Sequence, residues 1–256
     1  MTGDLDGKVA LVTGATTGIG RATAEAFLER GVSALVATGH DPDRLGAMQE
    51  TLSAHPGGVT VSALRWRAEA AEDAAAVAGR IGEMHGRLDV AVLNAGVTWP
   101  APLGAIEAEA AQRQFMVNVT GPLLLVQALA PILAPGGSVI LTTSCLDVLG
   151  MPGMAVYAAS KAALRSLART LSVELADRDV RVNTVAPGPV ETPIYGKLGM
   201  DEAQLAEMSA DIAGRVPAGR FAQPHEIAGA VAFLASDASA YMRGAEMPVD
   251  GGWSTL

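Results

Sequence analysis

The chain has few of the residues on which secreted, membrane-bound and nucleic-acid-binding proteins depend. Its 256 residues include one cysteine, Cys145, so no disulfide can form within the chain, which fits a reducing compartment. Lysine and arginine number 18 against 27 acidic residues, and the net charge of −9 disfavours binding to phosphate backbones or anionic membranes. We therefore expect a cytoplasmic protein without nucleic-acid or membrane partners.

Long apolar runs, aromatic side chains and metal-ligand patterns are also scarce. The segment Met1 to Lys8 lacks the basic start and apolar run of a signal peptide. The most apolar stretch, Pro122 to Pro135, is too short to span a bilayer. Aromatic residues make up 4% of the chain, so the core must consist mainly of Ala, Val and Leu. The four histidines are scattered without metal-ligand spacing, so no metal site is expected.

Short apolar runs alternate with longer helical segments along the whole chain. Strands are expected at Lys8–Thr13, Ser33–Thr38, Val59–Arg65, Val90–Leu93, Ser138–Thr143, Val180–Ala186 and Glu246–Val249. Helices are expected at Ile19–Arg30, Asp41–Ala54, Glu72–His85, Glu107–Leu133 with a bend near Gly121-Pro122, Tyr157–Ala176, Asp201–Ala213 and Pro224–Ser236.

The expected strands are continuous apolar runs rather than alternating ones, which indicates a parallel sheet covered on both faces. Repeated strand–helix units predict a single α/β domain over residues 1–256. Its doubly wound parallel sheet should have about seven strands, with helices on both faces. Ligands of such sheets bind beyond the carboxyl ends of the strands, so the informative residues should follow each strand.

A glycine-rich turn, GATTGIG at residues 14–20, follows the first expected strand and opens the first helix. Without a Cβ, glycine lets the backbone turn sharply and lets a pyrophosphate approach the helix N-terminus. The spacing G-x-x-x-G-x-G differs from the common G-x-G-x-x-G dinucleotide pattern. An ordinary tight turn would also explain these glycines, but the position between strand and helix favours a dinucleotide site.

Further motifs follow the later strands in a fixed order. They are Asn94-Ala95-Gly96 after the fourth strand, Asn118 in the long helix, Ser144 at the fifth strand, Tyr157 and Lys161 as Y-x-x-x-K, Pro187-Gly188 and Thr192 after the sixth strand, and Val249-Asp250-Gly251-Gly252 at the end. Together with the glycine turn, this order resembles the short-chain dehydrogenase/reductase family from Gly7 to Gly252. The resemblance implies a Rossmann-type fold and hydride transfer between a nicotinamide cofactor and an alcohol or carbonyl compound.

The resemblance also implies a role for each residue of a catalytic group. Tyr157 would be the general acid or base, Ser144 would hydrogen-bond the substrate oxygen, and Lys161 would reach the nicotinamide ribose. Asn118 would hold water that links Lys161 to solvent. Taken singly, each has an ordinary structural explanation, such as a strand-end hydroxyl, a helix-capping amide or a lysine that reaches out to water.

The separation of Tyr157 and Lys161 has a physical rationale. Residues four apart on a helix share one face. Free tyrosine, with a pKa of about 10, is a poor base at neutral pH, and a nearby ammonium lowers that pKa. A general acid or base works best when its pKa is close to the working pH.

Cofactor contacts are implied mainly for residues that follow strands. They are Gly14, Thr16, Thr17, Gly18, Ile19, Gly20, His40, Asn94, Ala95, Gly96, Tyr157, Lys161, Pro187, Gly188, Val190 and Thr192. Gly39 stands where NAD-users of the family place Asp, and His40 where an arginine often stands. Arg67 replaces a frequent Asp near the adenine. These departures favour NADP(H), while NAD(H) stays open because Asp41 could bind the ribose.

The resemblance further implies a substrate lid around residues 194–213 and a homotetramer. An apolar substrate pocket is suggested by Trp99, Leu146, Val148, Met151 and Met154. Two alternatives to an oxidoreductase remain at this point: a cofactor-binding sensor without turnover, and a lyase or epimerase on the same fold.

Overall fold

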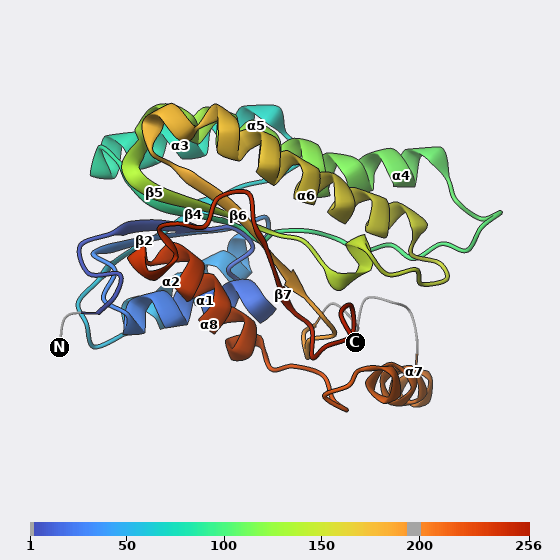
Figure 1. Ribbon diagram of the computed structural model, residues 1–256. Helices are drawn as coiled ribbons and strands as arrows, with labels where there is room; N and C mark the ends of the chain where they lie inside the picture. The colour runs from blue at the N-terminus through green and yellow to red at the C-terminus, as the bar shows by residue number, and fades with distance from the viewer. Residues whose placement is uncertain (1–2, 194–200) are drawn as a thin grey trace.

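The computed structural model describes residues 3–193 and 201–256. Its centre is a parallel sheet of seven strands in the order β3-β2-β1-β4-β5-β6-β7. The strands are β1 Val9–Val12, β2 Ala34–Gly39, β3 Thr60–Arg65, β4 Leu88–Leu93, β5 Leu133–Thr142, β6 Arg181–Pro187 and β7 Glu246–Val249. The order reverses between β1 and β4, which confirms the predicted doubly wound topology (Figure 1).

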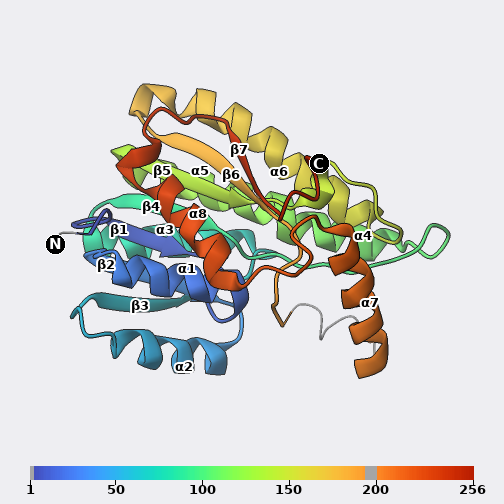
Figure 2. The same ribbon diagram turned by 60° about the horizontal axis from the view of Figure 1, so that its bottom comes forward.

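Helices cover both faces of the sheet, as predicted. On one face lie α1 Gly18–Glu29, α2 Pro42–Ser53 and α8 Pro224–Ala235, and on the other lie α3 Ala71–His85, α5 Gly121–Leu129 and α6 Ala155–Glu174 (Figure 1). The helix α4, Ala108–Phe115, precedes α5 on the same side. Figure 2 shows α7, Glu202–Arg215, standing apart from these two layers.

Side chains of alternate strand residues enter two separate cores. Val12 of β1 packs with Phe27 of α1 in the core under α1, α2 and α8. Its neighbour Leu11 packs with Ile81 of α3 in the core under α3, α5 and α6. All four residues of β1 are buried, so both faces of the strand require apolar side chains and the sequence shows an uninterrupted run.

The long helix expected at Glu107–Leu133 is not one regular α-helix. A π-helical turn, Met116–Thr120, joins α4 to α5, and a short 3₁₀ turn, Ala130–Ile132, leads directly into β5. Pro122 cannot donate a hydrogen bond to the carbonyl of Asn118, four residues earlier, and its ring crowds that carbonyl. The bend expected at Gly121-Pro122 therefore takes the form of a π-turn that contains Asn118.

The helical segment Ala108–Ile132 is also longer than the apolar run Pro122 to Pro135, which by itself is too short to span a membrane. Within the described ranges, one helical segment, Ala108–Ile132, is long and apolar enough to cross a membrane by length and composition alone. Its residues Leu125, Val126 and Leu129 are buried in the core shared with α3 and α6. The segment is therefore explained as a core helix of the fold.

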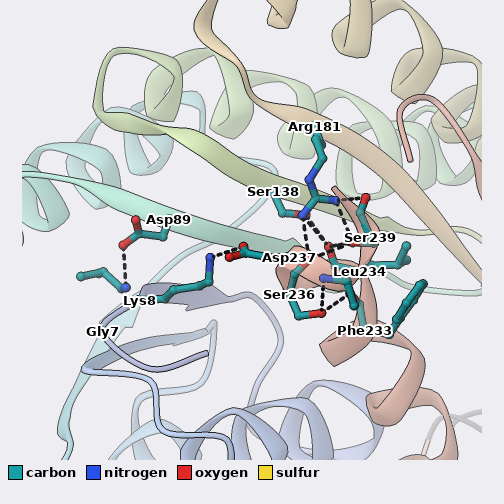
Figure 3. Close-up of polar contacts among 12 residues, drawn as sticks. Gly7, Lys8, Asp89, Ser138, Arg181, Phe233, Leu234, Ser236, Asp237 and Ser239 are labelled. Carbon is teal, nitrogen blue, oxygen red and sulfur yellow. Dashed lines mark hydrogen bonds and ion pairs between the residues drawn. The ribbon is translucent and has the colours of Figure 1, made fainter. Parts of the chain in front are cut away.

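Polar contacts at the amino ends of the strands serve the fold (Figure 3). Arg181, the first residue of β6, is 3% exposed and donates to the carbonyl oxygens of Ser239 at 3.1 Å, Leu234 at 3.2 Å and Ser236 at 3.2 Å. These carbonyls lie at and beyond the end of α8, so the guanidinium fixes the helix C-terminus to the sheet. The opposite edge, at the carboxyl ends, holds the residues singled out from the sequence.

Candidate active site at the carboxyl edge of the sheet

The turns after β1 and β4 are fixed side by side by Thr13. The Thr13 hydroxyl oxygen accepts hydrogen bonds from the backbone nitrogens of Asn94 at 3.0 Å and Ala95 at 3.1 Å. The Asn94 side-chain amide donates back to the Thr13 carbonyl oxygen at 3.1 Å. Asn94 thus joins the two strands on either side of the topological switch point, where nucleotides bind in such sheets.

The glycine turn is shaped for close approach. Gly14 and Gly18 have φ of +65° and +56°, and a Cβ on Gly20 would lie 2.3 Å from the Gly14 carbonyl oxygen. A Cβ on Gly18 would lie 3.1 Å from Thr192 Cγ2, so the turns after β1 and β6 also meet. The turn therefore needs glycine at these positions, as the sequence indicated.

The first turn of α1 is open to an anion. Thr17 is its N-cap, yet the Thr17 side chain makes no capping hydrogen bond, and the first turn contains no acidic residue. The free N–H groups and the positive end of the helix dipole suit a pyrophosphate. The residues after β1 therefore fit a dinucleotide.

Lys161 and Tyr157 lie together at the start of α6. The helix begins at Ala155, two residues before the predicted start, so Tyr157 belongs to its first turn. Lys161 is 4% exposed, its Nζ lies 5.7 Å from the centroid of the Tyr157 ring, and it donates to the carbonyl oxygen of Thr142 at 2.7 Å. Burial lowers the pKa of Lys161 to about 8, although the negative charge of Asp147 acts to raise it.

Ser144 lies two residues beyond β5, on the same side of the sheet. It is 8% exposed and caps a 3₁₀ turn, Cys145–Asp147, with its Oγ accepting from the backbone nitrogen of Leu146 at 3.2 Å. The adjacent Cys145 is buried, and desolvation raises the pKa of its thiol to about 12. That thiol is a packing group rather than a nucleophile.

Asn118 holds the loop after β4 against α6. It is fully buried, its Oδ1 accepts from the Val97 backbone nitrogen at 2.8 Å, and its Nδ2 donates to the Val97 carbonyl oxygen at 2.9 Å and to Ser160 Oγ at 3.0 Å. Both side-chain atoms are therefore engaged with protein. A Cβ on Gly96 would lie 3.2 Å from Asn118 Oδ1 and 3.4 Å from Lys161 Nζ, so these three predicted residues converge.

The segment after β6 is fixed by the C-terminal motif. Gly188 donates its N–H to the Val249 carbonyl oxygen at 3.1 Å, and a Cβ on Gly188 would lie 2.6 Å from Asp250 Cα. Val190 is 4% exposed, so its side chain belongs to the core and its backbone is what can face a ligand. The V-D-G-G motif thereby supports this wall of the site.

The acidic residue just after β2, Asp41, caps the next helix. The Asp41 carboxylate accepts from the backbone nitrogens of Arg44 and Asp43 as the N-cap of α2, and hydrogen bonding from Arg44 in particular lowers the pKa of Asp41. A side chain at Gly39 is obstructed, because its Cβ would lie 2.8 Å from Thr16 Cγ2. His40 is exposed beside them.

The two arginines at the end of β3 differ in their partners. Arg67 forms two side-chain hydrogen bonds to Asp73, at 2.9 and 2.8 Å, so its charge is neutralised locally. Arg65 was not among the sequence predictions, but it lies opposite Gly39 in the parallel register and its Nε donates to the His40 carbonyl oxygen at 3.4 Å. The register between neighbouring strands is the signal that would have identified it.

Two loops form an apolar wall beside Ser144 and Tyr157. The Thr98 hydroxyl lies 3.8 Å from Met154 Sδ, and Ala101 donates its N–H to the Gly153 carbonyl oxygen at 2.9 Å. Trp99 and Val148 on these loops are 37% and 53% exposed. The suggested pocket residues therefore lie on two connected loops, and Leu146, in the turn after β5, is 9% exposed.

The expected lid lies partly outside the described residues, because 194–200 are not included. Its remainder, 201–213, belongs to α7, which Asp201 opens with a capping box to Gln204. Within α7, Ile212 is the buried residue, at 5% exposure.

Comparison with known proteins agrees with this geometry. A family model described as enoyl-(acyl carrier protein) reductase matches residues 14–254. A 3-oxoacyl-(acyl-carrier-protein) reductase of Thermotoga maritima is 36% identical over 250 residues, which is 97% of this chain and 98% of that protein. A glucose 1-dehydrogenase of Gluconobacter oxydans is 37% identical over 249 residues, covering 96% and 91% of the two chains.

Solved structures give the same result. A short-chain dehydrogenase/reductase from Serratia marcescens superposes with a TM-score of 0.90 at 30% identity, covering 98% of this chain and all of that one. A blue fluorescent protein from a metagenomic library, in complex with NADPH, has the same TM-score, identity and coverage. The chain belongs to the short-chain dehydrogenase/reductase family. It is an oxidoreductase with a nicotinamide dinucleotide as its class of cofactor and small molecules as its substrates.

Proposed function

We propose that this protein is an alcohol dehydrogenase or ketoreductase that prefers NADP(H), with Tyr157 as its general acid and base. The observation that supports this proposal most is the buried ammonium of Lys161, 5.7 Å from the Tyr157 ring centroid. A cation in this place favours the phenolate over the phenol. Burial of an ammonium costs solvation, which favours a functional reason for this lysine over a merely structural one.

The chemistry divides between the cofactor and the chain. The nicotinamide ring supplies or accepts the hydride when the cofactor is bound. Tyr157 gives its hydroxyl proton to the carbonyl oxygen during reduction, or takes it from the alcohol during oxidation. Ser144 stabilises the negative charge that develops on the same oxygen. Asn118 positions the loop of Gly96 beside Lys161, and Lys161 orients the ribose.

The test is turnover with product analysis. Purified protein is mixed with NADPH or NADH and a panel of aldehydes, ketones and cyclic ketones, and the loss of reduced-cofactor absorbance is compared with the alcohol formed. We expect one alcohol per reduced cofactor consumed. Tight cofactor binding with no turnover on any panel member would instead favour a sensor, and an altered product without net cofactor oxidation would favour a lyase or epimerase.

The preference for NADP(H) is supported by charge at the end of β2. Gly39 offers no carboxylate to the ribose, and the carboxylate of Asp41 is already engaged in capping α2. Arg65 lies at this end of the strand, where its Nε donates to the His40 carbonyl oxygen, and a 2′-phosphate is a suitable partner for a guanidinium. We expect Arg65→Gln to lower kcat/KM for NADPH about tenfold and to leave that for NADH unchanged.

A matched control for this change is Arg80→Gln, which removes a guanidinium from the exposed pair with Glu83 on α3. Arg80→Gln should leave the ratio of the two kcat/KM values unchanged. A wild-type preference for NADH, or equal effects of Arg65→Gln on both cofactors, would contradict the proposed preference.

The proposal extends to assembly, lid and location. Exposed apolar residues on the helices, among them Val173 at 76%, Phe115 at 36% and Phe233 at 36%, are suited to a homotetramer, which light scattering would test against a monomer.

We place a substrate lid at residues 194–213, within one catalytic domain. Slower proteolysis of this segment with bound cofactor would support it. We also propose a cytoplasmic location, which fractionation of the native host would test.

A further inference from the structure

A largely buried cluster of charged side chains lies one helical turn beyond Lys161. Its members are Asp147 of the turn after β5, Arg165 of α6 and Glu246 of β7. Arg165 follows Lys161 by four residues, so both project from one face of α6. The proposed reaction uses none of these three groups.

The geometry leaves Asp147 without adequate partners. Its side chain is 1% exposed, and neither carboxylate oxygen accepts a hydrogen bond within the part of the chain that the structure describes. Arg165 Nε lies 3.6 Å from Asp147 Oδ2, while the other arm of the same guanidinium lies 3.4 Å from Glu246 Oε2. Two carboxylates therefore share one guanidinium, so Arg165 can neutralise only one of the two negative charges.

Glu246 is better satisfied than Asp147. Its Oε2 accepts a hydrogen bond from Arg165 at 3.4 Å, and its side chain is 19% exposed to solvent. Its Oε1 lies 3.3 Å from the Thr143 hydroxyl, which is shared with the Val185 carbonyl oxygen at 3.0 Å. Asp147 is therefore the carboxylate that Arg165 neutralises less well. Lys161 lies one helical turn before Arg165 on α6, and Arg165 contacts Asp147, so the buried Lys161 ammonium is the next cation on this face of the helix. Lys161 and Asp147 each favour the charged form of the other.

We propose that Asp147 is a positioning residue for the reaction: its buried carboxylate is the counter-charge that keeps Lys161 protonated beside Tyr157. Arg165 and Glu246 control whether that carboxylate is ionised. This inference rests on the proposed function, because the ammonium of Lys161 matters to the reaction through Tyr157.

The titration of the cluster gives the inference a direction. Burial above all, and then the neighbouring Glu246 carboxyl group, raise the pKa of Asp147 to about 7, whereas Arg165 and Lys161 lower it. Cys145, on the same turn, stays a neutral thiol. Above neutral pH the Asp147 carboxylate is ionised and supports the Lys161 ammonium. Below neutral pH it is a neutral acid, which asparagine imitates.

The experiment compares wild type with Asp147→Asn. Asp177→Asn, an exposed change of the same charge and size, is the control. Selective labelling of lysine at the ε-carbon gives three resonances, from Lys8, Lys161 and Lys197, and Lys161→Arg identifies the one that matters. We expect the Lys161 pKa to fall by about 0.5 to 1.5 in Asp147→Asn and to stay unchanged in the control.

Turnover provides the second readout. The alkaline limb of kcat/KM should move to lower pH by the same amount, so that activity at pH 9 falls about 3- to 30-fold while activity at pH 6 is close to wild type. A merely structural role for Asp147 would lower kcat/KM at both pH values without moving the limb. An unmoved Lys161 titration in folded Asp147→Asn overturns the inference.

These readouts separate the two proposals. A wild type without turnover contradicts the proposed function, while the lysine resonance still tests the coupling of Asp147 to Lys161.

If Asp147→Asn does not fold, Glu246→Gln replaces it. The Lys161 resonance should show a minor inflection near pH 7 from Asp147, which Glu246→Gln should move to lower pH. An inflection that stays in place overturns the inference.

Discussion

Replacement of Lys161 by methionine should change how the stability of the protein depends on pH. In the unfolded chain this lysine has the ordinary pKa of 10.5, and burial lowers it to about 8 in the folded chain. This difference corresponds to a cost of about 3 kcal/mol for keeping the buried ammonium at neutral pH. A methionine of similar length fills the same space without that cost.

The sign follows from proton binding. Between pH 8 and 10.5 the unfolded chain binds the lysine proton more tightly than the folded chain, so the wild type gains stability as pH rises through this interval. The gain between pH 7 and 9.5 is about 2 kcal/mol, and Lys161→Met lacks it. At pH 7 the variant avoids the buried charge but leaves the Thr142 carbonyl without its donor, at a cost of about 1–3 kcal/mol.

Lys161→Met should therefore equal or exceed wild type at pH 7, by up to about 2 kcal/mol, although it loses turnover. Urea unfolding without cofactor, at several pH values and one protein concentration, measures this. Lys161→Arg is the matched control, because its guanidinium stays charged over the whole pH range. This variant should therefore also lack the rise of stability with pH, but it should be less stable than Lys161→Met because it keeps a buried charge. Equal pH dependence of wild type and Lys161→Met would refute the reasoning.

Two further predictions concern the glycine turn and the amino edge of the sheet. Gly20→Ala should weaken cofactor binding at least about tenfold in a fluorescence titration, because its Cβ would lie 2.3 Å from the Gly14 carbonyl oxygen; unchanged affinity would contradict a rigid turn. Arg181→Met should lower the free energy of unfolding by about 2–4 kcal/mol with KM unchanged, since three carbonyls lose a buried donor. A loss below about 0.5 kcal/mol would show that these carbonyls find other partners.

The parallel sheet could be predicted because strands buried on both faces leave uninterrupted apolar runs. The candidate site could be located because the glycine turn, the N-A-G segment, Ser144 and the P-G segment each follow a strand, and parallel strands bring their carboxyl ends to one edge. An irregularity near Asn118 was predictable, because Pro122 lies four residues later and has no N–H to donate to the Asn118 carbonyl oxygen. Its π-helical form was not. Its exact form depends on the hydrogen bonds of Asn118 to Val97, in the loop after β4, and to Ser160, in α6. Both partners are distant from Asn118 in the sequence.

The charged groups could not be interpreted from sequence alone. Arg67 draws attention as a departure from the family pattern, but it is paired with Asp73, whereas Arg65 stands opposite Gly39. The cluster of Asp147 with Arg165 and Glu246 joins three elements, and spacing along the chain gives no sign of it. Such pairings are decided by strand register and helix packing, which no local pattern encodes.

The central claim, that Tyr157 exchanges the proton with the substrate oxygen, is tested most directly by Tyr157→Phe. The control is Tyr241→Phe, which removes a hydroxyl from a fully exposed tyrosine. We expect Tyr157→Phe to bind the cofactor normally and to lose about 10²- to 10⁴-fold in kcat, while Tyr241→Phe keeps wild-type turnover. Wild-type kcat in a folded Tyr157→Phe variant would contradict the account.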